Sequence, residues 1–328
     1  MTSSDQSSRC TQIIAAIRGE VNKTLVGQEH LLDSLLIALM TGGHILLEGV
    51  PGLAKTTAVR ALAAALGLDT RRISFTPDLL PADVTGGLTY NHKEGTFTPR
   101  KGPVFTHLLI ADEINRAPAK VQSALLEAMQ ERQVTLGDTT YPLPEPFLVM
   151  ATQNPIEQEG TYPLPEAQTD RFMLKCVVKH PGREDERRIM NGNTRPETMA
   201  APAPVCCVTP EDIALLRRSA SEVHCDAKVD DYILDLVFAT RNPTSFKGLE
   251  RLEGAIQLGA SPRASICLKQ AARATALLRG RSYATPQDVK DVAHDVLRHR
   301  LLLTYEAEAE NLTPDSVIDC LLTEVPVP

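Results

Sequence analysis

The chain has 328 residues, a length that corresponds to about two domains at roughly 150 residues per domain. Charged residues make up 23% and hydrophobic residues 43% of the sequence, which is globular composition and excludes a collagenous, low-complexity or disordered chain. Lysine and arginine total 34 against 41 aspartates and glutamates, so the formal net charge is −7. This acidity disfavours a protein whose main task is to coat nucleic acid, and we expect no nucleic-acid partner.

The N-terminal segment 1–10 is polar, and the longest apolar runs, such as 35–40, are much shorter than a membrane-spanning helix. We therefore expect neither a signal peptide nor a membrane span. The expected location is cytoplasmic.

Short apolar runs alternate with helical patterns over the first two-thirds of the chain, which is typical of a parallel sheet covered by helices. Hairpins are predicted at 88–98 and 134–141, where turn residues separate two short strand patterns. The predicted strands are 44–48, 71–75, 107–111, 147–151 and 172–176. The predicted helices are 8–25, 29–40, 55–66 and 118–132. The fold class is therefore α/β, with a parallel five-stranded core.

A change in composition predicts the domain boundary. Residues 193–210 contain four prolines and no helical or strand period, so we interpret them as a linker. Residues 1–192 would form the α/β core with its two hairpin insertions, and 211–328 a smaller all-helical domain. Three helices of that domain are predicted to begin at Thr-Pro pairs, where the threonine caps the helix and proline occupies its first turn. These pairs are Thr209-Pro210, Thr285-Pro286 and Thr313-Pro314.

A phosphate-binding loop lies directly between the first predicted strand and the helix at 55–66. Polyphosphate binding needs converging backbone amides at a helix N-terminus, a lysine for the outer phosphates and a hydroxyl for Mg²⁺, and Lys55 and Thr56 supply the last two. The usual motif has glycine before the lysine, whereas this chain has Ala54. The residues expected to contact the nucleotide are Gly49, Val50, Pro51, Gly52, Leu53, Ala54, Lys55, Thr56 and Thr57.

Two acids end the strand at 107–111. Asp112 and Glu113 follow this apolar run, and carboxylates at the end of a buried strand are costly unless they meet a cation or a proton-transfer task. Taken alone, an apolar run followed by two acids indicates only a strand that leaves the core. Together with Lys55 and Thr56 it predicts that Asp112 and Thr56 hold Mg²⁺ and that Glu113 polarises the attacking water.

Further polar side chains complete the predicted site. Asn154 follows the strand at 147–151 at the same edge of the sheet, where its amide could hold the attacking water, although it could also be only a turn residue. Arg171 and Arg263, judged singly, are ordinary surface arginines. Phosphoryl transfer spreads negative charge that an arginine from a lid or a neighbouring subunit stabilises, which makes both of them catalytic candidates.

The order of these motifs resembles the MoxR branch of the AAA+ ATPases, a helix-2-insert, pre-sensor-2 clade, over about residues 26–292. The motifs that carry the resemblance are Gly49-Val-Pro-Gly-Leu-Ala-Lys-Thr56, Ala111-Asp-Glu-Ile-Asn-Arg-Ala-Pro-Ala-Lys120, Ala124-Leu-Leu-Glu-Ala-Met129, Ala151-Thr-Gln-Asn-Pro155, Leu164-Pro-Glu-Ala-Gln-Thr-Asp-Arg-Phe172 and Gly259-Ala-Ser-Pro-Arg-Ala264. The family commonly carries the alanine at the position of Ala54.

The resemblance implies roles for individual residues. Asn154 would be sensor 1, Arg171 the arginine finger for the ATP of the next subunit, and Arg263 sensor 2, acting on its own nucleotide or on a neighbour's. Val26 and Gly27 would lie beside the adenine. The hairpins would be the helix-2 and pre-sensor-1 insertions, and Tyr90 and Phe97 on the first would either contact a client or only pair across the hairpin.

The function expected on this basis is that of an Mg-dependent ATPase that assembles as a ring, a hexamer in the favoured form, and remodels a client protein or complex. The resemblance implies a partner with a von Willebrand factor A domain and a role in enzyme maturation or metal-cofactor insertion. The cofactors expected are ATP and Mg²⁺.

Three other functions fit the sequence less well. Asp83-Val-Thr-Gly86 matches a loose GTPase pattern, but the chain has no N-K-x-D guanine-binding motif. A DNA-directed AAA+ motor would need a basic surface, whereas doublets such as Arg217-Arg218 have acidic neighbours and read as solvated helix faces. A nucleotide-gated scaffold would have no need of a water-activating group such as Glu113.

Overall fold

The computed structural model describes residues 3–93, 95–155, 160–193 and 203–328. The chain forms two compact units. The sheet unit comprises Ala15–Phe172 and Cys176–Thr209, and the helical unit comprises Met1–Ile14, Met173–Lys175 and Pro210–Pro328.

A five-stranded sheet forms the centre of the sheet unit. Its strands lie in the order β2-β5-β8-β1-β9, and β2, β5, β8 and β1 pair in parallel. The strands are β1 (Ile45–Glu48), β2 (Thr70–Ser74), β5 (Leu108–Asp112), β8 (Leu148–Gln153) and β9 (Leu174–Val177). The predicted α/β class with a parallel five-stranded core is confirmed, with each strand within about two residues of its expected position.

Burial on both faces explains why the central strands read as continuous apolar runs. Every residue of β5 is buried, and Leu109 packs in one cluster with Val121 and Leu125 of α5 (Ala119–Glu131). Because side chains alternate along a strand, Leu108 and Ile110 point to the opposite face. Each such fully buried leucine or isoleucine stabilises the fold by about 1.5–3 kcal/mol. The sheet is therefore a rigid support for groups at its carboxyl edge.

The sheet unit also contains several helices. Helix α1 (Ser3–Val21) begins in the helical unit and continues into the sheet unit. The remaining ones are α2 (Glu29–Thr41), α3 (Lys55–Leu66), α4 (Pro81–Thr85), the 3-10 turn η1 (Ile114–Arg116), α6 (Glu166–Thr169) and α7 (Arg183–Asn193).

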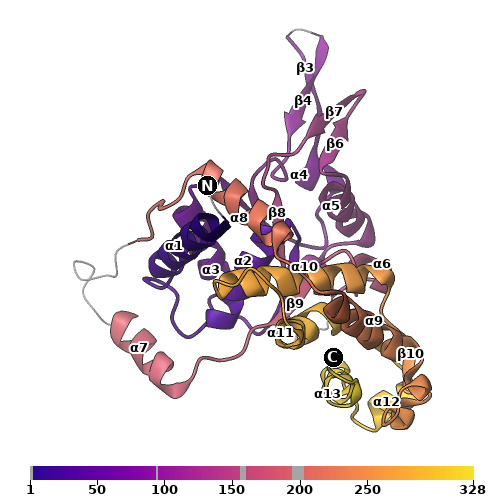
Figure 1. The fold of residues 1–328 in the computed structure, drawn as a ribbon. Coiled ribbons are helices and arrows are strands. Elements are labelled where there is room, and N and C mark those ends of the chain that lie inside the picture. The colour runs from indigo at the N-terminus through magenta and orange to yellow at the C-terminus, as the bar shows by residue number, and fades with distance from the viewer. Residues whose placement is uncertain (1–2, 94, 156–159, 194–202) are drawn as a thin grey trace. The chain divides into compact units, whose positions relative to one another are not determined.

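Two hairpins extend from the sheet unit and lie side by side (Figure 1). Strands β3 (Gly86–Asn91) and β4 (Thr96–Lys101) form the first, and β6 (Gln133–Leu136) and β7 (Thr139–Pro142) form the second. A Cβ on Gly137, which has φ +62, would lie 2.9 Å from Leu88 Cδ1, so the turn of the second hairpin contacts the first closely. Both predicted hairpins are present, and the first is longer than expected.

The helical unit contains one small ladder that the all-helical prediction missed. Strands β10 (Ile256–Leu258) and β11 (Leu302–Leu303) pair antiparallel. As expected, helices begin at the prolines of all three Thr-Pro pairs. The helices are α8 (Pro210–Glu222), α9 (Ala227–Arg241), α10 (Pro262–Leu278), α11 (Pro286–Leu297), α12 (Tyr305–Ala309) and α13 (Pro314–Glu324), with 3-10 turns η3 (Pro243–Ser245) and η4 (Glu250–Leu252).

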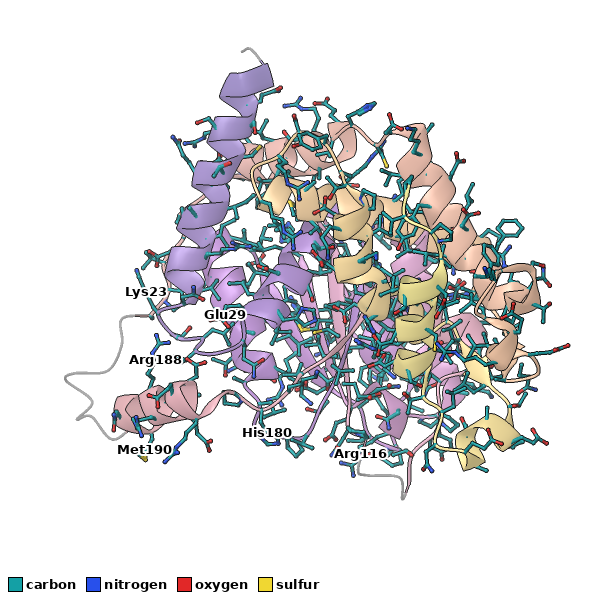
Figure 2. All side chains as sticks on the ribbon, turned by 60° about the horizontal axis from the view of Figure 1, so that its bottom comes forward. Lys23, Glu29, Arg116, His180, Arg188 and Met190 are labelled. Carbon is teal, nitrogen blue, oxygen red and sulfur yellow. The ribbon has the colours of Figure 1, made fainter. Side chains whose placement is uncertain are left out.

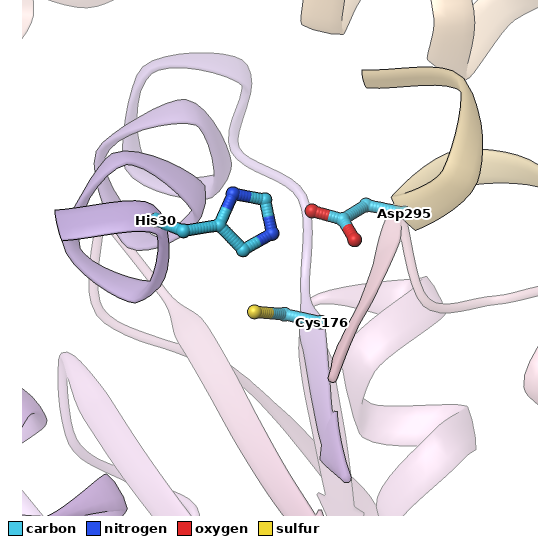
Figure 3. A group of neighbouring side chains, drawn as sticks. All are labelled: His30, Cys176 and Asp295. Atoms are coloured by element: carbon cyan, nitrogen blue, oxygen red, sulfur yellow. The ribbon is translucent and has the colours of Figure 1, made fainter. Parts of the chain in front are cut away.

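Helix α2 meets strand β9 through two polar side chains. Figure 3 shows His30 and Cys176 facing each other, and a ring nitrogen of His30 lies within 4.8 Å of Cys176 Sγ. A histidine and a cysteine alone do not complete a structural zinc site. Asp295, the third residue in Figure 3, belongs to the helical unit, where it accepts a hydrogen bond from Arg298 Nη1 at 2.5 Å.

Across the described ranges, no helix combines the length and the apolar character that crossing a membrane requires.

Candidate functional site

The loop between β1 and α3 adopts a conformation that demands small residues. A Cβ on Gly49 would lie 2.9 Å from the carbonyl oxygen of Val178, and Gly52 has φ +87. Ala54 sits in the left-handed region at φ 58, immediately before α3. The unpaired N–H groups of the first turn of α3 therefore begin at this loop, where they and the helix dipole favour an anion.

Lys55 is half-buried behind this loop, and its ammonium group donates a hydrogen bond to the carbonyl oxygen of Gly49. Burial lowers the pKa of Lys55, and the carboxylates of Asp112, Glu113 and Glu48 oppose that shift. The lysine therefore gains from any anion that enters the pocket.

Asp112 and Glu113 meet Thr152 at the carboxyl edge of the sheet, because β5 and β8 are neighbours in parallel register. The Thr152 hydroxyl donates to Asp112 Oδ1 at 3.4 Å and accepts from the Glu113 N–H at 2.9 Å. Glu113 has a left-handed backbone at φ 57. Such strain in a residue other than glycine costs about 1 kcal/mol and is concentrated at functional sites.

Each acid also pairs with an arginine. Arg72 Nε on β2 donates to Asp112 Oδ2, and Arg116 Nη1 donates to Glu113 Oε2 at 2.9 Å. The sequence prediction missed Arg72, Arg116 and Thr152. A signal existed for Arg116 and Thr152, which lie inside the quoted motifs, but Arg72 is recognised only once β2 is known to lie beside β5.

Lys55, Arg72, Asp112, Glu113 and Thr152 line one pocket of about 850 Å³, formed within the sheet unit. Its walls carry four basic side chains against two acidic ones, a local excess of positive charge in an acidic chain. The lining residues are Lys23, Thr24, Val26, Gln28, Pro51, Gly52, Leu53, Ala54, Lys55, Thr56, Thr57, Arg72, Ser74, Asp112, Glu113, Thr152, Gln153, Asn154, Pro181, Arg188 and Ile189. The pocket therefore suits an anion attached to a larger, partly apolar group.

The part of the pocket formed by residues 23–28 and α7 has a mixed apolar and basic wall. Val26 and Ile189 line it, and Figure 2 shows Arg188 on the side of α7 nearer Lys23, with Met190 on the opposite side. Gln28 Nε2 donates to the Lys179 carbonyl oxygen at 3.0 Å and so ties residues 23–28 to the segment between β9 and α7.

Five of the residues expected at the site lie outside the pocket lining. Gly27 packs against α7, where an added Cβ would lie 2.8 Å from Asp185 Cβ. Gly49 and Val50 belong to the loop, and Gly49 lies against the Val178 carbonyl oxygen. Arg171 follows α6, with its N–H bonded to the Gln168 carbonyl oxygen at 3.2 Å. Arg263 is exposed in the first turn of α10, in the helical unit.

The chain matches two family models. Residues 44–174 match the model described as "ATPase family associated with various cellular activities (AAA)", and residues 249–320 match the AAA lid domain. The first match contains the loop, both acids and Asn154.

Individual relatives cover nearly the whole chain. Chaperone MoxR1 from Mycobacterium tuberculosis is 49% identical over 94% of this chain and 81% of its own length. Protein MoxR from Paracoccus denitrificans is 36% identical over 99% of this chain and 98% of its own. A crystal structure from Cytophaga hutchinsonii, 48% identical, superimposes with a TM-score of 0.90 over 99% of this chain and 97% of that one. With this identity along its whole length, the chain belongs to the MoxR family of AAA+ ATPases.

Proposed function

We propose that this chaperone-type AAA+ ATPase binds ATP with Mg²⁺ in the pocket at the carboxyl edge of the sheet, and that hydrolysis there remodels a client protein. One observation carries the proposal. Lys55, Thr56, Asp112, Glu113 and Asn154, which come from two strand ends and one helix start, all line the same pocket. Phosphate binding, cation binding and water activation each have a suitable group there.

The donor set suits Mg²⁺. The Asp112 carboxylate and the Thr56 hydroxyl are hard oxygen ligands of the kind that this ion prefers, and both line the pocket. Bound magnesium would neutralise the negative charge of the phosphates during phosphoryl transfer. Lys55 and the amides of the loop would hold the phosphate oxygens.

Glu113 would accept a proton from the attacking water, which Asn154 would orient. The ion pair between Arg116 and Glu113 at 2.9 Å bears on this role, because the carboxylate engaged by Arg116 has to turn toward the water. Arg116 would then regulate how often Glu113 is available as a base.

Assembly into a ring, with a hexamer as the favoured form, belongs to the same proposal. Arg171 lies outside the pocket lining of its own sheet unit, which supports a role as an arginine finger on the nucleotide of a neighbouring subunit. Arg263 would act as a second sensor from the helical unit. Loss of the γ-phosphate contacts would then move the units against each other.

The name of the relative Chaperone MoxR1 supports a client protein as the object of remodelling. We include in the proposal a partner with a von Willebrand factor A domain, a role in enzyme maturation or metal-cofactor insertion, and a cytoplasmic location. The exposed aromatic pair Tyr90 and Phe97, with ring centroids 5.1 Å apart on the first hairpin, offers a surface for the client.

The test of the proposed chemistry is Glu113→Gln, measured for ATP binding by calorimetry and for hydrolysis by phosphate release. The amide keeps the shape but cannot take a proton, so hydrolysis should fall by about 10²- to 10⁴-fold while ATP binding persists. Glu127→Gln, on the exposed face of α5, is the matched control and should hydrolyse ATP normally. Near-normal hydrolysis by Glu113→Gln would remove Glu113 from the mechanism.

The trans role of Arg171 is tested by mixing two inactive variants. Lys55→Ala removes the phosphate ligand and Arg171→Ala removes the finger, so mixed rings contain some interfaces with both groups intact. Partial recovery of hydrolysis is expected at intermediate ratios. Failure to recover at any ratio would count against a finger that acts across the interface.

A further inference from the structure

Arg72 is the basic side chain closest to the proposed magnesium ligand. It projects from β2, which pairs with β5 so that Arg72 stands opposite Ile110 and Ser74 opposite Asp112. The guanidinium reaches along the strand toward the carboxyl edge, where its Nε donates to Asp112 Oδ2. Both side chains line the pocket, so the ion pair faces the space proposed for the phosphates.

The rest of the Asp112 carboxylate is weakly engaged. From the residues that the structure describes, its Oδ1 accepts one long hydrogen bond, at 3.4 Å, from the Thr152 hydroxyl. Arg72 is therefore the principal partner of a carboxylate whose side chain is 11% exposed. The side chain of Arg72 is 48% exposed, so the pair contributes at most about 1 kcal/mol to stability. Because this contribution is small, stabilising the fold does not account for the position of Arg72 beside Asp112.

We infer that Arg72 is a positioning residue that competes with Mg²⁺ for Asp112. The inference rests on the proposed function, because it takes Asp112 to be the magnesium ligand. A guanidinium and a divalent cation that share one carboxylate repel each other, even though Arg72 holds Oδ2 and leaves Oδ1 weakly engaged. Arg72 therefore opposes magnesium binding at Asp112, and a guanidinium pushed away by the ion remains in the pocket with Lys55, where it can face the nucleotide phosphates.

This competition affects the affinity for magnesium-free nucleotide and the affinity for magnesium in opposite directions. When magnesium is absent, Arg72 neutralises Asp112 and lessens the repulsion between that carboxylate and the nucleotide phosphates. When magnesium is present, Arg72 opposes its binding. Loss of the guanidinium should weaken magnesium-free nucleotide binding and strengthen magnesium binding, whereas a local defect in folding would weaken both.

The experiment titrates the full chain with the non-hydrolysable analogue AMP-PNP by calorimetry, first in EDTA and then at increasing Mg²⁺ concentration. Arg72→Met should weaken binding in EDTA and lower the half-saturating Mg²⁺ concentration, each by about threefold to tenfold. Arg72→Lys, which keeps the charge, should restore most of both values. Arg71→Met removes the same charge from the adjacent position of β2, whose side chain points to the other face, and should match the unmodified chain.

Several results would overturn the inference. Equal weakening of both affinities in Arg72→Met would show a structural role, and two unchanged affinities would show none. If the unmodified chain does not bind AMP-PNP at any Mg²⁺ concentration, the proposed function fails as well. Normal binding by the unmodified chain with an unchanged Mg²⁺ midpoint in Arg72→Met would refute only the role of Arg72.

Discussion

Asp112 in the sheet unit and Asp288 in the helical unit are both buried carboxylates paired with arginine, but their surroundings differ. Asp288 is fully buried at the start of α11 and accepts hydrogen bonds from Arg279, from Arg281, and from both the N–H and the hydroxyl of Thr285. Asp112 accepts from Arg72 and, at 3.4 Å, from Thr152, and it opens onto the pocket.

This difference distinguishes Asp288, a carboxylate that stabilises the fold, from Asp112, a carboxylate that can bind a ligand. A carboxylate offers about four lone-pair positions, and Asp288 uses them all within its own unit. Burial alone would raise the pKa of Asp288, but hydrogen bonds from Arg281 and Thr285 outweigh burial and hold that pKa below its ordinary value. Asp112 keeps capacity for a further ligand, so its loss should affect chemistry more than folding.

The largest expected effect tests Asp112. Asp112→Asn removes the charge that would hold Mg²⁺, so ATP hydrolysis should fall by at least about 100-fold. The free energy of unfolding should change by less than about 1 kcal/mol, because the pair with Arg72 is partly exposed. Phosphate release and urea denaturation measure the two quantities. Normal hydrolysis would show that Asp112 is no magnesium ligand.

Asp288 should show the opposite pattern. Asp288→Asn leaves Arg279 and Arg281 without their buried partner and should lower the free energy of unfolding by about 3 kcal/mol, with ATP affinity of the folded protein retained. Denaturation followed by circular dichroism is the measurement. Asp291→Asn, which removes a carboxylate whose contacts with Arg279 and Gln287 are exposed, is the control and should cost less than about 1 kcal/mol. Equal costs for the two variants would contradict the distinction.

His44 extends the comparison to a buried histidine whose hydrogen bonds are all internal. The Val149 N–H donates to Nδ1 at 3.0 Å, so Nε2 carries the proton and donates to the Met129 carbonyl oxygen at 3.1 Å. Burial lowers the pKa of His44 from 6.5 to about 4. The unfolded chain therefore takes up a proton first as pH falls.

The contribution of neutral His44 to the free energy of unfolding should be fully present above pH 6.5. It should decline, by up to about 3 kcal/mol, as pH falls to about 4. Urea denaturation across this range measures the decline. His44→Gln cannot be protonated there, so it should remove this part of the pH dependence. An unchanged slope in the variant would assign the decline to other groups.

The smallest effect concerns the phosphate loop. Ala54 has φ 58, a conformation that glycine adopts without strain, so Ala54→Gly should raise the free energy of unfolding by up to about 1 kcal/mol. Thermal and urea denaturation are sensitive enough to detect this. A loss of stability would show that the methyl group makes contacts worth more than the strain.

The strands and the helix after the phosphate loop were predictable because local pattern dictates them. A strand buried on both faces is continuously apolar, as β5 is, and Lys55 begins α3 as expected. The β10–β11 ladder was not predictable, since β11 has two residues and pairs with a segment more than 40 positions away. Such a short strand has no period of its own.

The site residues were likewise predictable only where a local sequence motif marks them. Lys55, Thr56, Asp112, Glu113 and Asn154 belong to local motifs, and the sequence therefore places them at a helix start and at strand ends that a parallel sheet brings together. Arg72 carries no motif. Its position depends on the strand order β2-β5, which results from packing across the whole unit rather than from neighbouring residues.

The most direct test of the central claim is a calorimetric titration of ATP with Mg²⁺ into the unmodified chain and into Lys55→Ala. We expect one saturable site in each unmodified chain. In Lys55→Ala, binding should weaken by at least about tenfold, because the ammonium group proposed to contact the phosphates is gone. Equal affinity in the two proteins would contradict the assignment of the pocket to the nucleotide.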